Sequence, residues 1–379
     1  MSAKAARKKA KSVTAAKTGG GDVLGASRNF LSKLLTEGVV DYLLVPEEIS
    51  GGRSLALSLI KNPEQLDKAN TFSPVMPISG AVMVAQLTGD KPEKKLGAVL
   101  KPCEIRALVE LVKLGQANLE NVTIIGTDCL GTFEVEDYAR VFDEMKGSAG
   151  EKSTLVLNEM RQNISEPESL PAELRSACKM CTSFTPTITN INIGLFGEGD
   201  EVLVSLDDDL AGKLGLEVKE NAGRDEVINK LMEIRNQTRQ QVFTEFRDKM
   251  KSIVDFADCL DTCIRCYACQ AACPLCYCRV CFFRTDTFEP ESDRYYRWAD
   301  REGAVRMPTE ILLYHLTRLS HVALSCCGCG MCQSACPRGL PLTAIFQTVG
   351  DGLQEALNYV PGRDLDEKIP VTTFSEIEV

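Results

Sequence analysis

The sequence predicts an α/β body followed by a cysteine-rich domain, and two patterns in its 379 residues support this fold class. One is a strand, a helix and a second strand between Gly97 and Ile125, spaced as in a βαβ unit with parallel strands. The other is the run C-x2-C-x2-C-x3-C-P, which begins at Cys263 and recurs at Cys326. Bacterial-type ferredoxins hold cubane iron–sulfur clusters with this run. We therefore expect a mixed or parallel sheet and a C-terminal dicluster ferredoxin-like domain.

Composition limits the class of protein. Hydrophobic residues make up 44% and charged residues 25%, as in globular domains with apolar cores. No apolar run approaches the ~18 residues that suggest a membrane-spanning helix. The first twenty residues carry six basic and no acidic side chains and lack the apolar stretch of a secretory signal, so we expect residues 1–22 to be a disordered basic tail of a cytoplasmic protein. The net charge of −10 argues against nucleic acid and membrane surfaces as partners.

Apolar spacing predicts the elements of the body, residues 23–221, in chain order. A helix over 26–37 ends at a glycine, and a strand over 39–45 ends at a proline, which cannot donate to a sheet ladder. The βαβ unit comprises 97–100, 104–114 and 122–125, and strands follow at 191–196 and 202–206. Apolar residues every three or four positions predict one connecting helix from about 225 to 256, within 222–258. The ferredoxin-like domain then covers 259–345, with a C-terminal extension over 346–379.

The fourth cysteine of each run is expected to ligate the other cluster, as in two-cluster ferredoxins. The first cluster would bind Cys263, Cys266, Cys269 and Cys336, and the second would bind Cys326, Cys329, Cys332 and Cys273. Cys327 falls outside the spacing and is not expected to be a ligand. Zinc and disulfides are the alternatives. Zinc sites favour two separated cysteine pairs, and disulfides are reduced in the cytosol, so clusters explain the repeated run better.

The body contributes a second group of cysteines. Cys103 and Cys129 follow neighbouring parallel strands, at the rim where open α/β sheets bind ligands. Cys178 and Cys181 form a C-x-x-C pair that could complete a metal site with them. The pair alone is also compatible with a redox-active dithiol, a zinc site or no site, and the first two cysteines could be unrelated buried thiols.

The 17 cysteines include four further candidates beside the first run: Cys259, Cys276, Cys278 and Cys281. They could bind an additional cluster, shield the neighbouring cubane or remain free thiols. The two histidines, His315 and His321, are expected to be structural or surface groups rather than ligands. No residues match a hydrolytic triad, a zinc-protease motif or a phosphate-binding Walker loop, so no catalytic acid–base residue is assigned.

Three separated motifs resemble the beta subunits of coenzyme F420-reducing hydrogenase and formate dehydrogenase. They are Lys101-Pro102-Cys103-Glu104-Ile105-Arg106-Ala107-Leu108, Gly126-Thr127-Asp128-Cys129 and Cys178-Lys179-Met180-Cys181-Thr182-Ser183-Phe184-Thr185. The segment from Cys263 to Cys278 is most similar to the formate dehydrogenase version. The resemblance extends from about Val39 to Leu342. Where the family often has Ala-Asp-Ile-Ser-Val-Gly, this chain has Thr189-Asn190-Ile191-Asn192-Ile193-Gly194 and so lacks the acidic residue.

The resemblance implies an α/β body that binds FAD beside a [4Fe-4S] cluster on Cys103, Cys129, Cys178 and Cys181. It implies that the ferredoxin-like end exchanges electrons with a catalytic formate dehydrogenase or hydrogenase subunit. The flavin would exchange a hydride with coenzyme F420 or an equivalent carrier. The cofactors would thus be FAD and three clusters, with a fourth if the additional cysteines bind one; the FAD-contacting residues are not assigned.

Such a chain of cofactors would convert one-electron transfer through clusters into two-electron transfer at a flavin. We therefore expect an iron–sulfur flavoprotein subunit of a cytoplasmic formate dehydrogenase. The alternative is an electron-transfer adaptor of a hydrogenase or a heterodisulfide-reductase-linked complex, with NAD(P) or a protein as acceptor.

Overall fold

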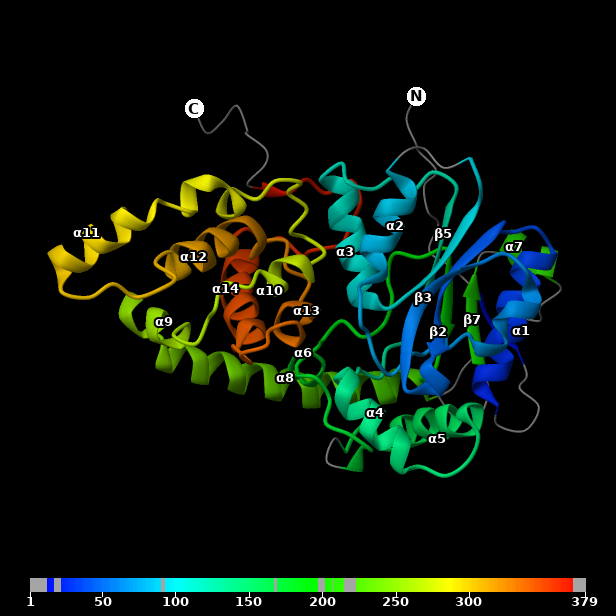
Figure 1. Ribbon diagram of the computed structural model, residues 1–379. Coiled ribbons are helices and arrows are strands. Elements are labelled where there is room, and N and C mark those ends of the chain that lie inside the picture. Colours follow the sequence, from blue (N-terminus) through cyan, green and yellow to red (C-terminus); the bar gives the residue numbers. More distant parts are fainter. Residues whose placement is uncertain are drawn as a thin grey trace.

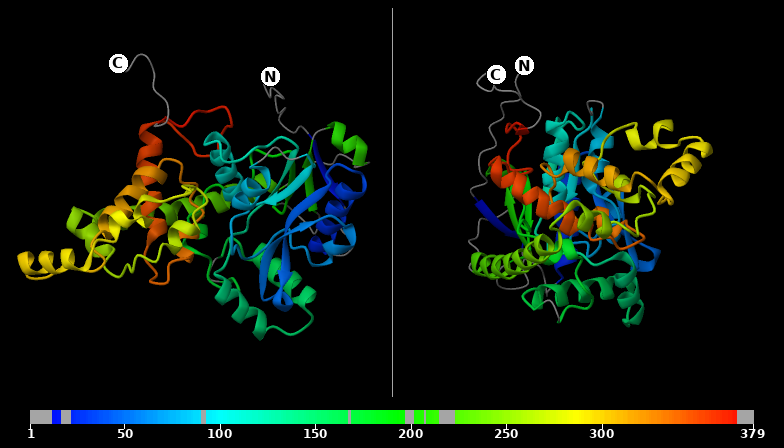
Figure 2. Two further views of the ribbon diagram at one scale, coloured as in Figure 1. Left: turned by 45° about the horizontal axis from the view of Figure 1, so that its top comes forward. Right: turned by 90° about the vertical axis from the view of Figure 1, so that its left-hand side faces the viewer.

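The computed structural model describes residues 12–16, 22–89, 93–166, 169–196, 202–206, 208–214 and 223–370. A sheet with flanking helices forms one half of the molecule, and the cysteine-rich helical segments form the other (Figure 1). The long helix α8 (Arg224–Lys249) runs along both halves. Helix α11 (Ser292–Glu302) projects at the end farthest from the sheet (Figure 2). No helix in the described part of the chain is long and apolar enough to span a membrane.

Within the described residues, the sheet has seven strands in the order β1-β7-β6-β5-β4-β2-β3. Their bounds are β1 Ser12–Ala16, β2 Tyr42–Ile49, β3 Ser54–Ile60, β4 Leu96–Leu100, β5 Val122–Thr127, β6 Ile191–Gly194 and β7 Val202–Leu206. The four central strands β2, β4, β5 and β6 pair in parallel, and β3, β7 and β1 pair antiparallel at the two sides. The expected mixed α/β sheet is therefore confirmed, and so is the βαβ unit, in which α3 (Pro102–Lys113) joins β4 to β5.

Alternation along the central strands gives the sheet two buried faces. Val99 and Ile125 pack into one core, and their neighbours Leu100 and Ile124 pack into the other. The first core is covered by α1 (Val23–Thr36), α4 (Val135–Glu144) and α5 (Ala149–Gln162). The second is covered by α2 (Gly80–Thr88) and α3, and it continues without a break into the cysteine-rich half. The two halves therefore share one apolar core.

The cysteine-rich half consists of short helices around its loops. They are α9 Ile253–Cys259, α10 Ala268–Ala271, α11, α12 Ile311–Val322, α13 Met331–Ser334 and α14 Leu342–Ala356. Helix α14 packs on α8, and the ion pair Arg239–Asp351 joins them at 2.8 Å. From the body, Arg106 donates to the carbonyl of Cys327 at 3.1 Å, and Arg175 donates to the carbonyl of Cys329 at 3.1 Å. These contacts fix the cysteine loops against the strand ends.

Most element boundaries shift by a few residues from the sequence-based expectations, and three regions differ more. Strand β2 does not end before Pro46 but continues to Ile49. Its parallel pairing with β4 stops at Leu44, so no hydrogen bond to β4 is lost through the missing N–H of the proline. The expected single helix over 225–256 is instead α8 and α9, since Ser252 and Asp255 form a capping box that starts a new helix.

The third difference lies in the expected basic tail. Its residues Ser12–Ala16 form β1 and pair with β7, which would otherwise be an open edge of the sheet. Residues 1–11 and 17–21 lie outside the described residues, as do 371–379 of the expected extension.

Candidate functional site

Four cysteines from three separated segments line one cavity beyond the carboxyl ends of β4 and β5, which we call the body cavity. Cys103 is the second residue of α3, and Cys129 follows β5 by two residues. Cys178 lies on the short helix α6 (Ser176–Lys179), and Cys181 follows it. The fold thus brings together the four cysteines that the sequence singled out in the body.

Hydrogen bonds from neighbouring loops hold these cysteines in place. The Thr132 amide donates to Cys178 Sγ at 3.3 Å, and the Cys129 amide donates to the Phe184 carbonyl at 2.9 Å. Burial raises the pKa of the Cys103 thiol well above its usual value and that of Cys129 to about 11. Burial therefore disfavours the thiolate forms, and a bound metal would have to supply the stabilising positive charge.

Asp128, next to Cys129, fixes the segment that follows β5. Its buried carboxylate accepts from Arg224 Nη2 at 2.7 Å and from the amides of Leu195 and Phe196 at 2.8 and 3.2 Å. One side chain thus connects the end of β5, the end of β6 and the start of α8. The position of Cys129 depends on these long-range contacts.

A second cavity, which we call the junction cavity, is lined by residues of the cysteine-rich half. It is lined by the cysteines expected to hold the second cluster, Cys273, Cys326, Cys329 and Cys332, and also by Cys327. Cys329 and Gly328 line the body cavity as well, so the two cavities are adjacent. A hydrogen bond with Cys327 lowers the pKa of Cys329 to about 7. Cys327 thus contacts a predicted ligand although it lies outside the motif.

A third cavity, which we call the outer cavity, is lined by Cys263, Cys266, Cys269 and Cys336. The run over 263–269 curves around it with positive φ angles at Arg265 and Tyr267. Cys336 arrives from the other run, so the grouping follows the crossed pattern of the prediction. Cys266 is exposed, which places this cavity near the surface.

Helix α12, from the segment between the two runs, presents polar groups to the outer cavity. Arg318 Nη1 donates to Cys269 Sγ at 3.1 Å, and the Tyr314 hydroxyl lies 3.7 Å from the same sulfur. His315 Nε2 lies 3.5 Å from Cys263 Sγ, and burial lowers the pKa of this histidine to about 4. Sequence reasoning treated the histidine as structural or surface, and no motif indicated that this helix reaches the thiols.

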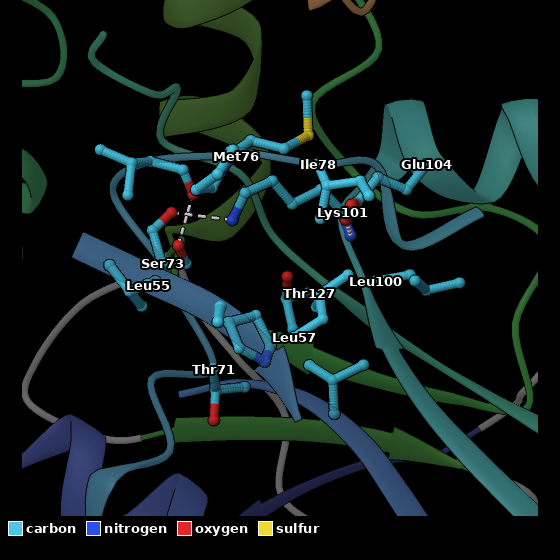
Figure 3. Close-up of a pocket in the computed structure, with 15 residues that line it drawn as sticks. Leu55, Leu57, Thr71, Ser73, Met76, Ile78, Leu100, Lys101, Glu104 and Thr127 are labelled. Carbon is cyan, nitrogen blue, oxygen red and sulfur yellow. Dashed lines mark hydrogen bonds between the residues drawn. The ribbon is translucent and has the colours of Figure 1, made fainter. Parts of the chain in front are cut away.

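A fourth cavity, the sheet-edge cavity, opens on the body side (Figure 3). Apolar side chains of β3 and β4 line it together with Thr71, Thr127 and Lys101. Lys101 Nζ donates to the Ser73 carbonyl at 2.8 Å, and both Lys101 and Met76 also line the body cavity. Sequence reasoning assigned no residue here. The available signal was the position of Lys101 and Thr127 at the ends of neighbouring parallel strands.

The four cavities form a connected series. Lys101 and Met76 join the sheet-edge and body cavities, and Cys329 joins the body and junction cavities. Arg318 lines the junction cavity and donates to Cys269 of the outer cavity. A row of sites therefore extends from the sheet to the surface of the cysteine-rich half.

The four additional cysteines do not line the body, junction or outer cavity. Cys276 lies beside Cys273, whose thiol donates to it and lowers its pKa to about 6, while Cys278 is exposed and Cys259 and Cys281 are half-buried. In the described part of the chain, no group of three or more His, Cys, Asp or Glu side chains could hold a single metal ion.

Comparison with known proteins gives a consistent result. Residues 93–254 match the family model that describes the C terminus of the coenzyme F420 hydrogenase/dehydrogenase beta subunit. The chain is 26% identical over 373 residues to the F420-dependent formate dehydrogenase subunit beta of Methanocaldococcus jannaschii, covering 91% of this chain and 92% of the relative. It is 25% identical over 385 residues to the F420-dependent formate dehydrogenase 1 subunit beta of Methanococcus maripaludis, covering 92% and 93%.

Among solved structures, a chain of the F420-reducing [NiFe] hydrogenase complex from Methanosarcina barkeri is similar over 65% of this chain and 94% of its own length. The identity is 15% and the TM-score 0.46. The family model and the two formate dehydrogenase relatives carry the assignment. By these comparisons the chain is similar to the beta subunits of coenzyme F420 hydrogenases and dehydrogenases, which are oxidoreductase subunits.

Proposed function

We propose that this chain is the electron-transferring beta subunit of a formate dehydrogenase, with [4Fe-4S] clusters in the body, junction and outer cavities and FAD in the sheet-edge cavity. The observation that carries the proposal is the connected series of cavities, three of which are lined by the cysteines predicted as cluster ligands. A flavin bound at the end of this series would exchange single electrons with the nearest cluster. A catalytic formate dehydrogenase subunit would exchange electrons at the opposite end.

The residues in each cavity fit these groups chemically. Four thiols around one cavity are the donor set of a cubane cluster, which is larger than a single metal ion and occupies the space between its ligands. The sheet-edge cavity is mostly apolar with a few polar groups, as expected for a flat aromatic ring with polar edges. Lys101 and the hydroxyls of Thr71 and Thr127 are available to orient those edges.

The cofactors would supply single-electron transfer at the clusters and two-electron or hydride exchange at the flavin. The protein's own residues would position these groups and exclude water from the path between them. Lys101 would keep a positive charge in the wall shared by the sheet-edge and body cavities. Glu104 anchors this wall, because its buried carboxylate accepts from the amides of Gly80 at 2.6 Å and Lys101 at 2.8 Å.

The flavin would exchange a hydride with coenzyme F420, as the names of the two formate dehydrogenase relatives suggest. The missing acidic residue near 189–194 leaves NAD(P) or a protein acceptor as the alternative carrier. The complex would be located in the cytoplasm.

Iron and flavin analysis of anaerobically prepared protein tests the proposal. Wild-type protein should contain FAD and iron for at least three clusters. Cys103→Ser should lower the iron by about four atoms per chain and impair reduction of the flavin through the clusters. Cys327→Ser is the matched control, because Cys327 also lines a cavity among other thiols but lies outside the motif, so the iron content of this variant should remain at the wild-type value.

Two outcomes would contradict the proposal. Unchanged iron in Cys103→Ser would show that no cluster binds in the body cavity. Wild-type protein with full iron but no released flavin would favour an adaptor that carries clusters alone. Separately, measuring whether the wild-type complex reduces F420 or NAD(P) would identify the carrier.

A further inference from the structure

Arg318 is a buried cation without a carboxylate partner among the described residues. It lies on α12 and is 4% exposed. Its hydrogen bonds go to Cys269 Sγ at 3.1 Å and to the Cys269 carbonyl at 3.2 Å, and its Nε has no partner in the described structure. The rings of Phe346 and Tyr314 lie 4.9 and 5.6 Å from the guanidinium carbon and enclose it.

Several other inward-facing arginines of the described residues are paired with carboxylates, whereas Arg235, which is also buried, donates to the Leu130 carbonyl. Arg224 is bound to Asp128, Arg239 to Asp351, and Arg265, in the first cysteine run, to Glu310. Burying a charge without compensation is costly, so a buried guanidinium normally has an anionic neighbour. The groups around Arg318 that could balance its charge are thiols: Cys269, to which it donates, and Cys273, which lines the junction cavity with it.

Arg318 also contacts two of the cavities. It lines the junction cavity together with Cys273 and Cys326 and also donates to Cys269 of the outer cavity. One positive charge therefore stands between two sets of four thiols. No other described arginine lines one of these cavities and donates to a cysteine sulfur of another.

We propose that Arg318 is a positioning residue that raises the reduction potentials of two neighbouring clusters, the outer and the junction cluster. The inference rests on the proposed function, because it requires clusters in both cavities. Electron uptake at either site adds one negative charge and no atoms. A nearby cation and a hydrogen bond to a ligand sulfur both stabilise the more negative state, and both are known determinants of cluster potential.

The test is a redox titration of the anaerobic complex followed by electron paramagnetic resonance. In Arg318→Met, the ratio of reduced to oxidised outer cluster at a fixed potential should fall at least tenfold, which is a shift of ~59 mV toward negative potentials for a one-electron couple. The junction cluster should shift in the same direction. The body cluster, identified as the signal absent from Cys103→Ser, serves as the internal reference and should not move.

Two controls separate charge from structure. Arg53→Met removes the same charge from an exposed ion pair with Asp143 and should leave all potentials unchanged. Tyr314→Phe removes the neutral group 3.7 Å from Cys269 Sγ and should change the ratio less than threefold. Arg318→Lys keeps the charge but not the planar fork, so it should shift the outer cluster less than Arg318→Met does.

Unchanged potentials in Arg318→Met with full iron would overturn the proposal. If that variant loses iron, Arg318→Gln and Arg318→Lys give the neutral and charged pair, and equal potentials for the two would also overturn it. Loss of iron in all three variants would assign Arg318 a structural role and reject tuning. Wild-type protein without clusters in these cavities would instead refute the proposed function.

Discussion

The body cavity and the outer cavity are lined by equivalent sets of four cysteines but are constructed differently. In the outer cavity, three cysteines lie on one tight loop over 263–269, and only Cys336 comes from elsewhere. In the body cavity, the four predicted ligands come from three segments, and Cys103 and Cys129 are neighbours because β4 and β5 pair in parallel. The outer site is therefore largely local, whereas the body site requires the folded sheet.

This difference determines what each site depends on. The body site depends on buried polar contacts such as those of Asp128, which hold the strand ends together. The outer site depends on its own loop and on α12 packed against it. Loss of the polar contacts at the strand ends should therefore remove the body site first and leave the outer site intact.

The largest expected effect comes from Asp128→Ala. The substitution leaves the Arg224 guanidinium and the amides of Leu195 and Phe196 without their buried acceptor, which should cost about 3–5 kcal/mol of stability. The iron of the body cluster should be lost while the iron of the outer and junction clusters remains. Denaturant unfolding and iron analysis measure the two effects.

Asp143→Ala is the control for Asp128→Ala, because it breaks the exposed pair with Arg53 and should change little. The distinction between the two sites would be wrong if Asp128→Ala removed iron equally from both.

A smaller effect is expected at Gly330, where the two halves touch. Its φ of +72° is unfavourable for other residues, and an added Cβ would lie 2.4 Å from the Ala177 Cβ, next to Cys178. Gly330→Ala should therefore cost about 1–3 kcal/mol by denaturant unfolding. Gly339 has a similar φ of +62° with nothing near the added carbon. Gly339→Ala thus reports backbone strain alone, and equal losses in the two variants would show that the close approach is unimportant.

The same difference explains how much could be predicted from the sequence. The two cysteine runs indicate the outer and junction sites directly, since their spacing is local. The positions of Cys103 and Cys129 followed from the βαβ spacing, and the fold confirms that they lie on one rim. Their association with Cys178 and Cys181 had no local pattern and was expected from the family resemblance.

Other features could not be predicted because they depend on tertiary contacts. Arg318 and His315 occur in an ordinary amphipathic helix, and nothing in its spacing indicates that the polar side faces thiols. The sheet-edge cavity combines residues of several strands and loops without a motif. The break between α8 and α9 had a local signal, the capping box at Ser252, but the continuous apolar period obscured it.

The smallest expected effect tests how firmly the C-terminal segment ties the cysteine-rich half to the body. The buried Tyr359 hydroxyl donates to Glu110 of α3 at 2.6 Å and accepts from Lys113 Nζ at 3.0 Å. Glu110 keeps Lys113 at 3.1 Å and the Gly362 amide at 2.8 Å when the hydroxyl is removed. Tyr359→Phe should therefore cost only about 1–2 kcal/mol by denaturant unfolding, without loss of iron.

Tyr296→Phe, at a position 69% exposed on α11, is the matched control and should leave stability unchanged. A loss of iron in Tyr359→Phe would mean that the cavities depend on this segment, and that the outer site is less local than its cysteine loop suggests. Retained iron with reduced stability would confine the role of Tyr359 to joining the two halves. The cysteine loop and α12 would then be sufficient to maintain the outer site.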